Sequence, residues 1–278
     1  MKRKLIIFII MTLIILIFKN YQLVLSSTID GVNIWFYKVF PYLFIMIIIQ
    51  DLLINLNFAN FLKRTATYIF FMSIISGSPS NAYIISKLVK EGKITKEYGN
   101  ICLIFTFFTN PLFLYSILNL IFNSFYMTIK IMIIIYISNF IIYLYYKKDL
   151  PVTNMSGKPS NINLPSSIKS SINTNLMVLG SIVFYFIISS ILIETFNIGY
   201  PFDIFLRGIL EMTQGLNNVI QLNSNIKLIT TIIFITFGGL SIHTQVKCIL
   251  DEYGLDYKYF FKGRILQLVI AAILAVLT

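Results

Sequence analysis

The chain has 278 residues, of which 57% are apolar or aromatic and only 12% are charged, and its mean hydropathy is +0.82. A soluble domain carries about 25% charged residues, so this composition excludes one and predicts an all-α, polytopic membrane protein in contact with the lipid bilayer. The net charge of +11 does not indicate a nucleic-acid partner. Lys and Arg stand at the ends of apolar runs, where they act as topology signals.

The first half of the chain opens with a basic segment (1–4) and a long apolar run (5–18). No small-residue cleavage site follows this run, so we expect an uncleaved first span over 5–25 with a cytoplasmic N-terminus. A second helix is expected over 32–56. A further span over 126–146 closes the first half.

The stretch GSPSN (77–81) interrupts an apolar segment that would otherwise continue as a buried helix. Gly77 stops the helix, Ser78 can cap a new one, and Pro79 suits its first position. The new helix is amphipathic, with these apolar residues on one face: Ile84, Ile85, Leu88 and Val89.

Two topologies are open for this break. If 65–90 is one full crossing, the lysines at 87, 90, 93 and 96 lie outside the cell, against the positive-inside tendency. If the chain enters halfway and returns as a re-entrant hairpin, the same lysines face the cytoplasm. The charge distribution favours the hairpin, whose exposed backbone at the tip could meet a solute; the alternative is a packed structural turn.

The pair Asn110–Pro111 is a second interruption, in a span near 99–122. Proline removes a helix hydrogen bond, so this span should kink or unwind. Thr106, Thr109 and Asn110 can satisfy the released backbone groups. The alternative is an ordinary proline kink.

A polar linker over 147–170, expected in the cytoplasm, separates the first half (1–146) from the second (171–278). Shifting the sequence by 162 positions places Gly77 on Gly239 and Gly92 on Gly254. The sequence therefore predicts two internal repeats, each with a broken or re-entrant helical hairpin. Chance alignment of glycines is the alternative.

The second half begins with a span over 172–194, followed by a helix over 202–220 that contains Asp203, Arg207 and Glu211. If this helix crosses the membrane, Glu211 is a functional candidate. If it lies at the interface, all three side chains are its solvated face. Both readings stay open.

Gly238 and Gly239 make the second predicted break, and Ser241 can cap the helix that follows. His243, the only histidine, could bind a solute, shuttle a proton or make a structural hydrogen bond. One histidine and two distant cysteines predict no metal site and no cofactor. No catalytic motif is present, so we expect no enzyme.

Several of these motifs resemble membrane proteins with the nucleoside recognition (Gate) domain, and most of all the sporulation integral membrane protein family, the YlbJ family. The resemblance is carried by SGSP (76–79), PLF (111–113), LEMTQG (210–215) and, most specifically, FGGLSIHTQV (237–246). It implies a part in spore formation. Related Gate domains occur in nucleoside transporters and ferrous iron transporter B, which implies solute movement. Asn81 replaces a glycine of the family pattern, and Phe107 and Phe108 replace asparagines.

The resulting hypothesis is a multi-pass cell-membrane protein that moves a small polar solute, nucleoside-like or ionic, between two hairpin tips. The rival hypothesis is a non-transporting scaffold for spore envelope assembly. The oligomeric state is left open. The predicted solute-binding residues are Gly77, Ser78, Pro79, Ser80, Asn81, Asn110, Glu211, Gly238, Gly239, Ser241, His243 and Gln245.

Overall fold

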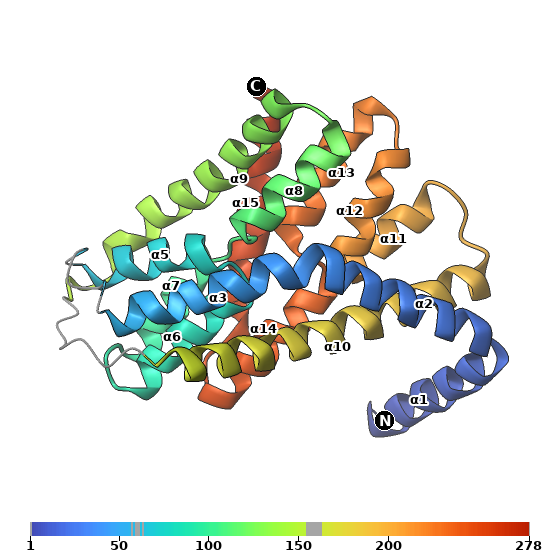
Figure 1. Ribbon diagram of the computed structural model, residues 1–278, viewed down its shortest axis with the longest axis horizontal. Coiled ribbons are helices and arrows are strands. Elements are labelled where there is room, and N and C mark those ends of the chain that lie inside the picture. The colour runs from blue at the N-terminus through green and yellow to red at the C-terminus, as the bar shows by residue number, and fades with distance from the viewer. Residues whose placement is uncertain (1, 57, 59–61, 63, 154–162, 278) are drawn as a thin grey trace.

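A computed structural model describes residues 2–56, 58, 62, 64–153 and 163–277, and the regular elements of this part of the chain are all helices (Figure 1). The predicted all-α fold is confirmed, and the chain is a polytopic membrane protein. Within the described residues, five helical stretches are long and apolar enough to cross a bilayer: Tyr21–Asn55, Phe125–Asp149, Leu164–Phe196, Ile226–Tyr253 and Tyr257–Leu277.

Two long helices form the frame of the molecule. The first is continuous across a π-helical turn, and it packs along α10 (Figure 1). A Cβ atom on Gly31 would lie 3.3 Å from the Val183 backbone, so glycine is what allows this close approach. The frame consists of α2 (Tyr21–Ile34), η1 (Trp35–Val39), α3 (Phe40–Asn55) and α10 (Leu164–Phe196).

The boundary between the first two predicted spans was wrong. Helix α1 (Lys2–Lys19) ends at a polar pair, and Asn20 turns its amide back to the Leu16 carbonyl at 3.0 Å. The chain then runs as a helix from Tyr21 to Asn55, where the sequence predicted a gap between 25 and 32. The π-helical turn directly precedes α3 and so accommodates Pro41, which lies in the first turn of α3.

The first half continues with a helical hairpin and an interrupted helix. Helix α5 (Thr65–Ser76) folds back on α6 (Ser80–Lys90), and the predicted apolar face of α6 is buried, apart from the half-buried Val89. The chain then passes through a non-helical stretch at 106–110, between α7 and α8. The remaining elements of this half are α7 (Lys96–Phe105), α8 (Pro111–Phe122), α9 (Phe125–Tyr146) and η2 (Lys147–Asp149).

The predicted start of α6 was wrong by one residue. Pro79 occupies the capping position instead of the first helical position, and no side chain caps this helix. The Ser78 hydroxyl instead donates to the Asn81 side-chain oxygen at 2.9 Å.

The second half contains a hairpin that the sequence did not predict. The segment 202–220, expected as one helix, is broken at Glu211 into α11 and α12, which fold back on each other. A Cβ atom on Gly215 would lie 2.2 Å from the Gly208 Cα, so the two glycines permit this contact. The elements are α11 (Phe202–Leu210), α12 (Met212–Asn218), η3 (Val219–Gln221) and α13 (Ser224–Phe237).

The break at Gly238 and Gly239 was predicted to form the tip of a hairpin, and this prediction was wrong. Helix α14 (Gly239–Tyr253) continues onward from α13 and packs against α6, α10 and α15 (Tyr257–Leu277). Both glycines have positive φ angles, +89° and +70°, which turn the helix without reversing it. Ser241 lies within the first turn of α14 and does not cap it.

Each half therefore has a hairpin followed by an interrupted helix. The order of elements gives Glu211, and not Gly239, the place that Gly77 has in the first half. The internal repeat itself stays a prediction. Two apolar cores lie on either side of these breaks, one built mainly from α5, α6, α7 and α14 and the other from α8, α9, α12, α13 and α15.

Candidate functional site

Three helix interruptions line one small cavity of about 50 Å³, and a fourth, at Gly238, packs against the lining residue Phe107. We call them the central breaks: 77–79, 106–110, 211 and 238. The two long helices close the cavity with apolar side chains. The lining residues are Val39, Leu43, Ser78, Pro79, Phe107, Thr109, Asn110, Phe113, Val178, Ile182, Glu211, Met212, Thr213, Ile242 and Gln245.

The non-helical stretch 106–110 is stabilised by donors from other segments. Asn81 donates its amide to the Thr106 carbonyl at 2.5 Å, and Asn139 donates to the Phe107 carbonyl. The backbone N–H of Ser78 donates to the Phe108 carbonyl at 2.7 Å. Irregular backbone survives inside a membrane protein only where such partners meet it. The first hairpin tip therefore supports the interrupted helix beside it.

Asn110 connects three elements at this point. Its side-chain oxygen accepts from the N–H groups of Leu112 and Phe113 at 3.0 and 3.2 Å, which caps α8. Its amide donates to the Tyr42 carbonyl in α3 at 3.3 Å. A Cβ atom on Gly77 would lie 2.6 Å from the Asn110 nitrogen, so the two breaks are in direct contact.

The threonines of this segment differ in their roles. Thr106 donates to the Cys102 carbonyl at 2.9 Å, as predicted for the released backbone groups. The same prediction was wrong for Thr109, whose hydroxyl is buried and forms no hydrogen bond with the described residues. Because Thr109 lines the cavity, its hydroxyl is available to an occupant.

Glu211 supplies a carboxylate to the cavity. The side chain is 2% exposed, and one oxygen accepts from the Gln214 N–H at 2.6 Å. The other oxygen accepts from the hydroxyls of Thr213 at 3.1 Å and Ser241 at 3.3 Å. These donors come from α12 and α14, so the carboxylate joins the second hairpin to the second interrupted helix.

The burial of Glu211 contradicts one of the two readings of 202–220, in which Asp203, Arg207 and Glu211 share a solvated face. Asp203 and Arg207 pair with each other at 3.9 Å and are partly exposed, whereas Glu211 is buried. Glu211 is therefore not part of a solvated face.

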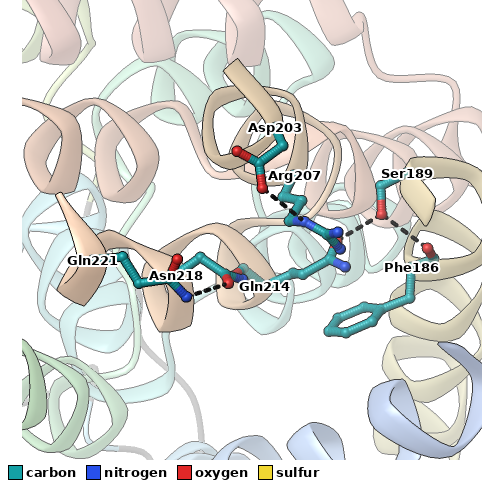
Figure 2. A network of polar contacts seen from close by, with 7 residues as sticks. All are labelled: Phe186, Ser189, Asp203, Arg207, Gln214, Asn218 and Gln221. Atoms are coloured by element: carbon teal, nitrogen blue, oxygen red, sulfur yellow. Dashed lines mark hydrogen bonds and ion pairs between the residues drawn. The ribbon is translucent and has the colours of Figure 1, made fainter. Parts of the chain in front are cut away.

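A hydrogen bond from α10 holds the second hairpin, formed by α11 and α12, against the frame (Figure 2). Ser189 donates to the Gln214 side-chain oxygen at 2.7 Å and shares its hydroxyl with the Phe186 carbonyl at 2.8 Å. Asn218 donates to the Gln214 carbonyl at 2.8 Å and so continues the chain of contacts along α12. This network holds α12 in place, and the first turn of α12 donates the Gln214 N–H to the Glu211 carboxylate.

His243 supports the second interrupted helix and does not line the cavity. Its Nε2 atom lies 2.9 Å from the Phe237 carbonyl, and its Nδ1 atom lies 2.6 Å from the Tyr257 hydroxyl. An Nε2–H tautomer satisfies both contacts, donating to the carbonyl and accepting from the tyrosine. Its position fits the structural role that the sequence left open.

The predicted solute-binding residues therefore divide into those that line the cavity and those that pack behind it. Ser78, Pro79, Asn110, Glu211 and Gln245 line the cavity. The remaining ones pack behind it: Gly77 against Asn110, Ser80 and Asn81 at the start of α6, Gly238 against Phe107, Gly239 against Met212, Ser241 on Glu211, and His243 on Phe237.

Arg264 is a residue that sequence reasoning missed. Its side chain is fully buried, and its guanidinium carbon lies 3.8 Å from the Phe107 ring centroid and 5.4 Å from that of Phe260. The available signal was a charged residue inside an apolar run, which marks functional sites in membrane helices. This signal was ambiguous, because Arg264 lies near the basic end of α15, where an arginine also indicates membrane topology.

No protein-family profile matches the chain, and no solved structure matches it. The chain is 24% identical, over an alignment of 310 positions, to the sporulation integral membrane protein YlbJ of Bacillus subtilis (strain 168). The alignment covers 89% of this chain and 75% of that protein. This similarity to an integral membrane protein agrees with the five membrane-length helices: the chain is a multi-pass membrane protein.

Proposed function

We propose that the chain is a cytoplasmic-membrane protein that takes part in spore formation and passes a small polar solute through the central cavity. The observation that carries the solute part is Glu211, a buried carboxylate in a cavity that three helix interruptions line. Ionisable groups inside membrane proteins are costly and commonly mark solute pathways. The similarity to YlbJ supports the part in spore formation, and the resemblance to Gate-domain proteins supports solute movement.

The size of the cavity limits what it holds in this conformation. At about 30 Å³ per water molecule, a volume of about 50 Å³ accommodates one or two waters or a small ion. Pockets for larger organic ligands have volumes of about 300–1,000 Å³. A nucleoside-sized solute would therefore require the central breaks to move apart.

The arrangement of the hairpins supports access from two sides. In Figure 1, α5, α6 and the start of α7 lie in the left half of the view, and α11, α12 and α13 lie in the right half. The lysine-bearing end of α6 also lies on the left, as does the end of α9, which Lys147 and Lys148 of η2 follow. With that end in the cytoplasm, the first hairpin is re-entrant from the cytoplasm and the second from the opposite side.

The accessibility of the cavity tests this proposal. In a Cys102→Ser, Cys248→Ser background, Ser78→Cys should react with a water-soluble thiol reagent applied to one side of sealed vesicles. Ser86→Cys is the matched control, because Ser86 is fully buried in α6 and does not line the cavity. If Ser78→Cys stays unlabelled from both sides, the solute path is refuted.

A cellular assay separates solute movement from the scaffold alternative. In a spore-forming host that lacks its own relative of this chain, Glu211→Gln should reduce spore yield at unchanged protein level. Glu194→Gln, at an exposed glutamate on α10, should not. A scaffold predicts that both variants behave like the original protein.

A further inference from the structure

Arg264 is a buried cation without an acidic partner. Among the described residues, which include every Asp and Glu of the chain, none forms an ion pair with it. Its internal hydrogen bonds all come from one nitrogen, Nη1, which donates to the Gln267 side-chain oxygen and to the Thr236 carbonyl at 3.5 Å. The Nε and Nη2 atoms are buried and have no hydrogen-bond partner among the described residues.

The two unused nitrogens form a specific shape. In a planar guanidinium group, Nε and Nη2 lie on one edge and point two N–H bonds in nearly parallel directions. Such an edge matches the two oxygens of a carboxylate or a phosphate. A buried positive charge is stabilised mainly by an opposite charge with good hydrogen bonds. The free edge therefore has the chemistry of an oxyanion site.

Phe107 contacts both the guanidinium group of Arg264 and the central cavity. The guanidinium group stacks on the ring at 3.8 Å, and the same side chain lines the cavity. Glu211 also lines the cavity, and its carboxylate disfavours an anion there. We therefore expect an anionic group to be more stable beside Arg264 than beside Glu211.

We propose that Arg264 binds the carboxylate or phosphate group of an anionic solute that enters from the central cavity when the Phe107 ring turns aside. This inference rests on the proposed function, and it names the chemical class of the solute. Two observations carry it: the two unused nitrogens of a fully buried guanidinium group, and the stacking of that group on Phe107, a ring that also lines the cavity.

Thermal unfolding of the purified full-length chain in detergent tests the site with two probes, inorganic phosphate and acetate. Sodium chloride at matched ionic strength corrects for screening. At about ten times the half-saturating concentration, the bound oxyanion should raise the melting temperature by about 3–6 °C. Arg264→Lys, which loses the two-pronged edge, should abolish the rise. Arg207→Lys, at a partly exposed arginine, should retain it.

A second pair of variants keeps the test informative if Arg264→Lys does not fold. Phe107→Ala removes the ring that contacts both the cavity and the guanidinium group, so it should lower the half-saturating phosphate or acetate concentration several-fold. Phe108→Ala removes the neighbouring buried ring, which packs on Phe70 and Tyr136, and should leave that concentration unchanged. Which probe acts at the lower concentration identifies the oxyanion class.

The site is refuted if chloride produces the same rise as both oxyanions, or if Phe107→Ala and Phe108→Ala change the response equally. The proposed function fails separately. If the oxyanion response depends on Arg264 while Ser78→Cys stays unlabelled from both sides, Arg264 holds a structural anion, and the assignment of a transported anionic solute is overturned.

Discussion

Replacing Gly77 by alanine should disrupt the contact between the first hairpin tip and the interrupted helix beside it. Gly77 has φ +71° and ψ −179°, a backbone region that is essentially restricted to glycine. An alanine Cβ would lie 2.6 Å from the Asn110 nitrogen and 2.9 Å from its Cα. Both atoms are backbone, so the clash cannot be relieved by rotating a side chain.

The expected cost has two parts. The backbone conformation costs about 1–3 kcal/mol in a residue other than glycine. Forcing a methyl group against packed backbone costs a further 1–3 kcal/mol, approximately. The total is about 2–6 kcal/mol. Gly92→Ala is the matched control, because Gly92 has φ +67° but nothing lies within 4 Å of its Cβ position. We expect it to cost only about 1–2 kcal/mol.

The assay is thermal unfolding of both variants and the original chain, purified in the same detergent. For a protein of this size each kcal/mol corresponds to about 2–4 °C. Gly77→Ala should therefore melt several degrees below Gly92→Ala. If the two variants melt at the same temperature, only the backbone conformation matters, and the inferred contact between the two central breaks is wrong.

Two further predictions address packing and accessibility. Gly263→Ala should lower the melting temperature, because the new Cβ would lie 2.1 Å from the Ile104 carbonyl oxygen. Gly180→Ala is the control, because the space around Gly180 in α10 is open, and it should raise the melting temperature slightly. Equal effects of the two variants would contradict the α7–α15 contact. A thiol reagent should modify the exposed Cys248 in the folded chain and the buried Cys102 only after unfolding. Peptide mass spectrometry identifies which cysteine has reacted. Rapid reaction of Cys102 in the folded chain would contradict the packing of α7.

The local breaks were predictable because they depend on the backbone chemistry of a few residues. Gly77, Pro111 and Gly238 stop or interrupt helices wherever they stand, and the chain breaks at or beside all three. The buried face of α6 followed from its spacing in the same way. The break at Glu211 carries no proline and no adjacent glycine, so the sequence reading left 202–220 as one helix.

What the sequence determined by itself was therefore the class of the protein and most of its interruptions, through composition and local backbone preference. The tertiary structure decided how those interruptions meet: that Glu211 is at a hairpin tip, that Asn81 and Asn139 satisfy carbonyls of 106–110, and that Arg264 stacks on Phe107. These contacts join segments that are far apart along the chain. Their partners are chosen by packing between helices, which the local residue pattern does not encode.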